Sequence, residues 1–198
     1  MPTEVAALGF KLHTGWATLV AVSGAPGNIR ILLRRRMELL PAGEPLPRFV
    51  YHKAAELPEA DAATLVARVE EASQAATRAA LQQVLKELRS PDIHVETAGI
   101  PAGSKKLPAS LSAILGSHPL IHTAEGRLFQ QAVVSACQVE QLRVTCATER
   151  DIWTRLGVAV REELDGLRKS VGPPWGADQK TAAAAALVAL QEMFGQHS

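Results

Sequence analysis

The sequence has few aromatic residues, few cysteines and almost no net charge, and each shortage argues against a class of protein. Aromatic side chains make up 4% of the 198 residues, too few for a base-stacking platform. The net charge of +1 gives no overall positive field that would draw the protein to nucleic acid or a membrane surface. Two cysteines are too few for a disulfide scaffold.

Long apolar runs and familiar catalytic signatures are also absent. The sequence contains no run of about 18 apolar residues, so no membrane span is predicted. The first residues also lack the basic segment followed by an apolar segment that is typical of a secretion signal. We therefore expect a cytoplasmic protein in which Cys137 and Cys146 are buried free thiols. The chain contains no glycine-rich phosphate-binding motif and no G-x-S-x-G nucleophile motif.

What the sequence does contain is the composition of a globular domain. Hydrophobic residues make up 47% and charged residues 21% of a chain of 21.1 kDa, which suits one domain over residues 1–198. Strand patterns are predicted at residues 4–11, 16–22, 29–40, 92–100 and 142–145. The segment between Pro41 and Pro58 contains several prolines and is predicted to be a surface connection.

Helical spacing of apolar residues predicts the remaining elements. The expected helices cover residues 59–89, 109–116, 123–139 and 153–167, with a last, alanine-rich helix over 178–194. Three consecutive strands followed by two strands reached through helices predict an α/β fold. It has a five-stranded mixed sheet, with the first three strands antiparallel and helices on both faces. This order of elements is that of the ribonuclease H-like fold.

Several segments resemble the RuvC-like Holliday-junction resolvases of the ribonuclease H-like superfamily. Their first hairpin is similar to LGFKLHTGWATLVAV, and their fourth strand is similar to DIHVETAGI. Their helix, short strand and following helix are similar to TAEGRLFQQAVVSACQVEQLRVTCATERDIWTRL, and the acidic, alanine-rich start of their last helix is similar to GADQKTAAAAALVAL. The resemblance covers most of the chain in order. It implies a nuclease fold in which carboxylates from the first strand, the fourth strand and the last helix hold two Mg²⁺ ions.

The carboxylates that this resemblance implies are incomplete. The matching positions are Lys11 in the first strand, Glu96 in the fourth strand and Asp178 in the last helix. A lysine ammonium repels Mg²⁺, so the first hypothesis is a degenerate site without metal or other cofactor, in a protein that binds or scaffolds. The alternative is a divergent Mg²⁺-dependent endonuclease in which Glu96 and Asp178, with Glu125 or Asp151, are the ligands.

Each of these residues also has a simpler interpretation. Lys11 either extends into solvent or pairs with Glu96, and we expect both side chains in one cleft at the carboxyl ends of neighbouring strands. Glu96 is otherwise a solvated strand residue, and Asp178 is otherwise a helix N-cap. His13 lies in the first turn beside the expected cleft, where it acts as an acid or base or is simply solvated.

Two further groups of residues are candidate ligand sites. His118 and His122 are four residues apart, but Pro119 between them favours a helix start over a metal pair, so no metal site is predicted. Arg34 and Arg36 share one face of the third strand, where they bind phosphate or protect a sheet edge. Lys105 and Lys106 would add to a phosphate site. As partners, nucleic acid and a second copy of the chain stay open, and no membrane is expected.

Overall fold

The sheet has the predicted five strands and the predicted mixed topology. The computed structural model describes residues 4–195. The strands are β1 (Glu4–His13), β2 (Trp16–Ser23), β3 (Arg30–Glu38), β4 (Ile93–Pro101) and β5 (Arg143–Ala147). Their order in the sheet is β3-β2-β1-β4-β5. β1, β2 and β3 are antiparallel neighbours, whereas β4 runs parallel to both β1 and β5. The fold prediction is therefore confirmed.

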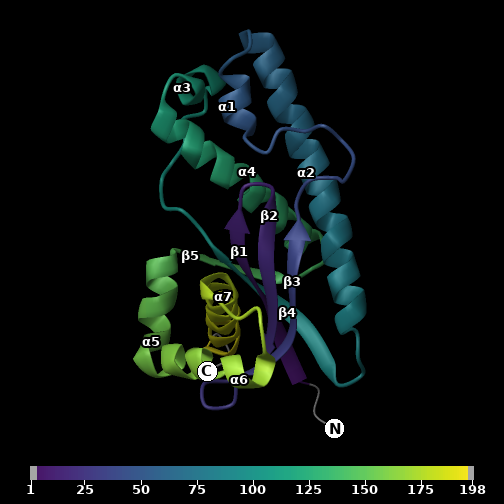
Figure 1. Ribbon diagram of the computed structural model, residues 1–198, viewed down its shortest axis with the longest axis vertical. Helices are drawn as coiled ribbons and strands as arrows, with labels where there is room; N and C mark the ends of the chain where they lie inside the picture. The colour runs from purple at the N-terminus through teal and green to yellow at the C-terminus, as the bar shows by residue number, and fades with distance from the viewer. Residues whose placement is uncertain (1–3, 196–198) are drawn as a thin grey trace.

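Helices cover both faces of the sheet and bury a separate apolar core on each face. One face packs against α2 (Glu59–Leu88) and α4 (His118–Val139), with the short helices α1 (Val50–Ala54) and α3 (Leu111–Leu115). The other face packs against α7 (Ala177–Gly195) and α5 (Glu149–Gly166), which α6 (Arg168–Val171) follows. Helices α1 and α3, with the adjoining ends of α2 and α4, extend beyond the turn between β1 and β2 (Figure 1).

Helix α7 lies directly against the sheet because glycines face it. Residues 181–190 are all buried, and their alanine-rich sequence lets the helix backbone approach the strands. A Cβ atom added to Gly9 of β1 would lie 1.8 Å from the carbonyl oxygen of Ala182, and one added to Gly99 of β4 would lie 1.9 Å from that of Ala185. These contacts fix the start of α7 relative to the carboxyl end of β1.

The structure corrects three of the predictions about elements, one missed helix and two helix boundaries. The segment between Pro41 and Pro58 contains helix α1, which is too short to show a periodic pattern. Helix α4 begins at His118, five residues earlier than predicted, because a proline is tolerated in the first turn of a helix. Helix α5 begins at Glu149 and is interrupted at Gly157, whose φ of 75° is not helical.

None of the helices between residues 4 and 195 combines the length and apolar character that a membrane span requires.

Candidate functional site

The candidate site lies at the carboxyl end of β1, on the face of the sheet that α5 and α7 cover. Lys11 and His13 are two residues apart in β1, so their side chains point to the same face as Gly9, which contacts α7. The amino ends of α5 and α7 approach this end of the strand and present one acidic side chain each. These are Glu149 and Asp178, both in the first turn of their helices.

Lys11 forms an ion pair with Glu149 and not with Glu96. The Lys11 Nζ atom donates to Glu149 Oε2 at 2.6 Å, and the two side chains are 27% and 46% exposed. Thr148, the residue before α5, caps the helix by accepting a hydrogen bond from the backbone N–H of Asp151. Glu149 was not predicted as a site residue, although it follows the end of β5 by only two residues, and the carboxyl ends of parallel strands meet at one edge of a sheet.

His13 forms the second pair of the site. Its Nε2 atom lies 2.8 Å from Asp178 Oδ2, and both side chains are about one-third exposed (32% and 33%). The His13 ring stacks on Trp16 with centroids 3.9 Å apart, while the Arg36 guanidinium lies 3.9 Å from the indole centroid. Two groups this close to one centroid must occupy opposite faces of the ring. Both faces of Trp16 are therefore covered, and the imidazole is held toward α7.

Glu96 lies away from this site, which corrects the prediction that it shares a cleft with Lys11. The β1–β4 register pairs Val95 with Ala6 and Thr97 with Ala7, leaving Glu96 exposed at an irregularity between them. Glu96 stands five residues before Pro101, the last residue of β4, which is roughly 16 Å along a strand. The register also pairs Gly9 with Gly99, and two further residues bring Pro101, not Glu96, beside Lys11.

The other predicted acidic ligands are held by structural contacts. Glu125 is buried in α4 and accepts hydrogen bonds from the backbone N–H groups of Val50, Tyr51 and His52 at 2.8–3.2 Å. Asp151 accepts the Thr148 hydroxyl at 2.7 Å as part of the α5 cap. These carboxylates stabilise helix starts. At the end of β1, the carboxylates that meet the basic side chains are those of Glu149 and Asp178.

The two arginines proposed for phosphate binding also have protein partners. The Arg34 guanidinium donates to the carbonyl oxygens of Val171, Gly172 and Pro174 at 2.5–2.8 Å, so it holds the loop that leads into α7. Arg36 pairs with Glu38 at 2.6 Å besides covering Trp16. β3 is an edge strand, as the alternative interpretation of the arginines required.

The two cysteines differ in exposure, so the prediction that both are buried is wrong for Cys146. Cys137 is fully buried, and this burial raises the pKa of its thiol to about 12. Cys146 is exposed as a residue, but protein around its thiol removes water and raises the pKa, with smaller lowering effects from Gln130 and Arg127.

We expect one slow-reacting thiol in the native protein. The thiolate is the reactive form, so a raised pKa makes the reaction of Cys146 slow at pH 7 and faster as the pH rises toward that pKa. Ellman's reagent should titrate one thiol per chain in buffer and two in urea. Cys146→Ser should remove the native signal, and a native signal that persists in this variant would show that Cys137 is accessible.

Comparisons with known proteins bear on the fold. No protein-family model matches the chain, and no curated protein matches it. Among solved structures, Thermus thermophilus RuvC in complex with a Holliday junction substrate superposes with a TM-score of 0.56 at 14% identity, covering 98% of this chain and 96% of that one. A second Thermus thermophilus RuvC structure gives 0.53 at 15% identity, covering 96% of each chain. Over nearly its whole length, this chain has the ribonuclease H-like fold seen in RuvC.

Proposed function

We propose that this chain is a ribonuclease H-like protein that does not cleave nucleic acid by two-metal chemistry and functions by binding. The observation that carries the proposal is the pairing of Lys11 with Glu149 and of His13 with Asp178 at the end of β1. Glu149 and Asp178 each already have a basic partner from the strand.

Charge counting supports the absence of two metal ions. Mg²⁺ is bound through oxygen atoms, and a two-metal site needs several carboxylates to offset a total charge of +4. Here the two carboxylates supply −2 and Lys11 supplies +1, leaving at most −1. A metal ion would also have to displace the Lys11 ammonium from Glu149.

A groove on the other face of the sheet, to which Leu12 of β1 points, supports nucleic acid as the partner. It has a volume of about 420 Å³ and lies between the loop after β4 and helix α4. We call it the Lys105–Arg127 groove after its two charged lining residues. The others are neutral or histidine: Leu12, Pro101, Gly103, Ser104, His122, Thr123, Gly126 and Gln130. Arg127 donates to the Lys105 carbonyl at 3.2 Å, which orders the loop. A basic groove without carboxylates favours phosphate.

The comparison structure points to the same class of partner. That RuvC structure contains a Holliday junction substrate, so branched DNA is the first ligand to test. Charge concentrated in one groove is compatible with a net charge of only +1, because the field near the groove depends on local charges.

The binding proposal predicts a loss of affinity when the groove is neutralised. Fluorescence anisotropy with a labelled four-way junction and a matched duplex should show binding that weakens as salt rises. The Lys105→Ala/Arg127→Ala double variant should bind at least tenfold more weakly. Its logarithmic slope of affinity against salt should become shallower by roughly 0.9 for each phosphate group that the protein no longer neutralises.

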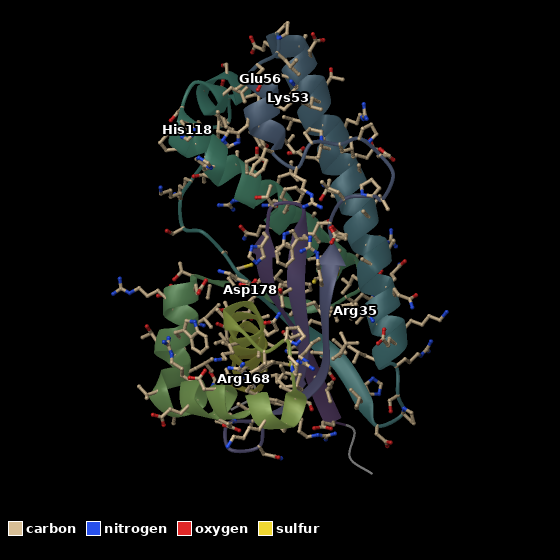
Figure 2. The ribbon with its side chains drawn as sticks, in the orientation of Figure 1. Arg35, Lys53, Glu56, His118, Arg168 and Asp178 are labelled. Carbon is tan, nitrogen blue, oxygen red and sulfur yellow. The ribbon has the colours of Figure 1, made fainter. Side chains whose placement is uncertain are left out.

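A second double variant controls for the change in net charge. Arg168→Ala/Lys169→Ala also removes two exposed positive charges, at α6, and Arg168 lies at the opposite end of the molecule from His118 (Figure 2). We expect it to bind as the wild type does. Equal reductions of affinity in both double variants, or no binding by the wild type at low salt, would reject nucleic acid as the partner.

A further inference from the structure

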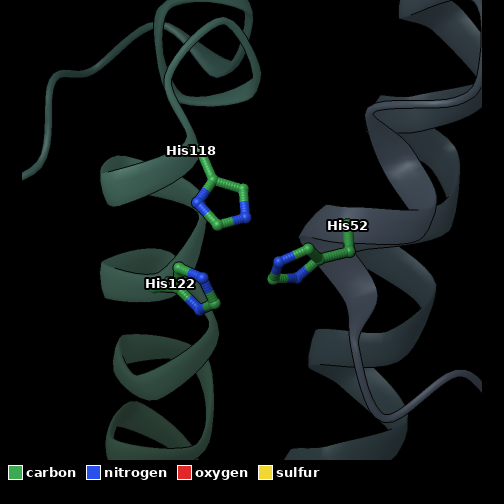
Figure 3. A group of neighbouring side chains, drawn as sticks. All are labelled: His52, His118 and His122. Atoms are coloured by element: carbon green, nitrogen blue, oxygen red, sulfur yellow. The ribbon is translucent and has the colours of Figure 1, made fainter.

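Three histidines from separate parts of the chain meet where α1 crosses the start of α4. Their ligating nitrogen atoms all lie within 4.8 Å of one another. The ring centroids of His118 and His122 are 4.5 Å apart, and His52 lies 5.6 and 4.8 Å from them. Figure 3 shows His118 and His122 on one helix facing His52 on the other. We call these three residues the His52 cluster.

The backbone explains why these side chains converge. His118 and His122 are one turn apart in α4, so they lie on the same face of the helix. The expected helix start is present, at His118, but it does not keep the two histidines apart, since Pro119 occupies the first turn without breaking it. Helix α1 is attached to α4 through the hydrogen bonds of Glu125, and this attachment brings His52 opposite the pair.

A buried carboxylate orients His52. Glu125 is 4% exposed, and its Oε1 atom lies 3.2 Å from His52 Nδ1. Because Oε1 and Oε2 accept backbone N–H groups as a carboxylate does, the Nδ1–H group is the donor in this contact. The neutral imidazole then has its lone pair on Nε2, the nitrogen free to bind an ion. A carboxylate that fixes a histidine in this way is a recurring support of metal ligands.

From this geometry we infer a binding site for one divalent transition-metal ion of the Zn²⁺ type, with His52 Nε2, His118 and His122 as ligands. Three imidazoles suit Zn²⁺, Co²⁺, Ni²⁺ or Cu²⁺, whereas Mg²⁺ prefers oxygen. Tetrahedral Zn²⁺ places its nitrogen ligands roughly 3.3 Å apart. His118 and His122 are exposed, so rotation of their side chains can close the present spacing. Three protein ligands leave a fourth position for water or another group.

The His52 cluster is separate from the ion pairs at the end of β1. Its ligands are nitrogen atoms from α1 and α4, and it uses neither Lys11, Glu149 nor Asp178. His122 also lines the Lys105–Arg127 groove, so a bound ion would add positive charge at the edge of that groove. Metal binding itself is measured without nucleic acid, so its failure and the failure of the binding proposal are separate results.

Calorimetric titration of the tag-free protein with Zn²⁺ tests the inference, together with the visible absorption of the Co²⁺ complex. We expect one equivalent to bind, with tetrahedral Co²⁺ bands. His118→Ala and His122→Ala should each weaken binding at least tenfold, and these exposed positions should leave the fold without metal unchanged. Glu125→Gln, which weakens the support of His52 and of the start of α1 together, should weaken binding by about tenfold or more.

A histidine outside the cluster is the matched control. His94 is exposed in β4 and is absent from the His52 cluster. His94→Ala should bind Zn²⁺ as the wild type does. The inference is overturned if the wild type binds Zn²⁺ no more tightly than His122→Ala, or if His94→Ala loses as much affinity as the cluster variants.

Discussion

Gly99→Ala should strongly destabilise the protein, by at least about 3 kcal/mol of unfolding free energy. The added Cβ would lie 1.9 Å from the Ala185 carbonyl oxygen and 2.3 Å from its carbonyl carbon. Both atoms belong to the backbone of α7, so no side-chain rotation relieves the overlap. The helix would have to move away from β1 and β4, breaking the packing of the core that it forms with the sheet.

Urea unfolding followed by circular dichroism measures this effect. Gly9→Ala should behave similarly, because its Cβ would lie 1.8 Å from the Ala182 carbonyl oxygen. Gly126 is the matched control: it lies inside α4, and a Cβ there would meet nothing within 4 Å. Gly126→Ala should stabilise the protein by up to about 1 kcal/mol. A Gly99→Ala variant as stable as the wild type would refute the close approach of α7.

The second large effect is expected at Glu125, where Glu125→Ala should cost about 3–5 kcal/mol of stability. The buried carboxylate accepts three backbone N–H groups at the start of α1 and also contacts His52. Alanine would leave these donors without an acceptor, and an unpaired buried donor is costly. Helix α1 should then detach from α4.

Comparison with Glu125→Gln separates the effect of the missing acceptors from that of the missing charge. Glutamine has nearly the same shape and keeps one acceptor oxygen, so its urea midpoint should lie between those of the wild type and Glu125→Ala. Detachment of α1 should also make its amides exchange faster with solvent. Equal stability of the alanine variant and the wild type would show that Glu125 does not hold α1.

Local sequence patterns were sufficient for the sheet but not for the pairing within the site. The strand and helix order followed from apolar periodicity and turn residues. Lys11 was placed in the first strand, but β1 runs two residues further and includes His13, which was expected in the turn. Glu96 was misplaced because β4 continues five residues beyond it to Pro101, and the β1–β4 register pairs Gly99, not Glu96, with Gly9 near the end of β1. Strand periodicity does not reveal which residue of a partner strand lies opposite.

Contacts between distant parts of the chain account for the other missed features. Helix α1 has five residues, and the carboxylate that caps it comes from α4. The sequence shows His118 and His122 as a pair, but only the attachment of α1 brings His52 to them. Glu149 reaches Lys11 because α5 begins beside the end of β1, a placement that depends on how the layers pack.

The central claim is that the end of β1 does not support two-metal cleavage, and a cleavage assay tests it directly. Wild-type protein is incubated with an end-labelled four-way junction in Mg²⁺ or Mn²⁺, beside Lys11→Asp and Asp178→Asn variants. We predict an intact junction with the wild type, because Lys11 and His13 occupy the carboxylates that metal ions would need. Cleavage gained only by Lys11→Asp would support the same account. Metal-dependent cleavage by the wild type that Asp178→Asn abolishes would contradict it.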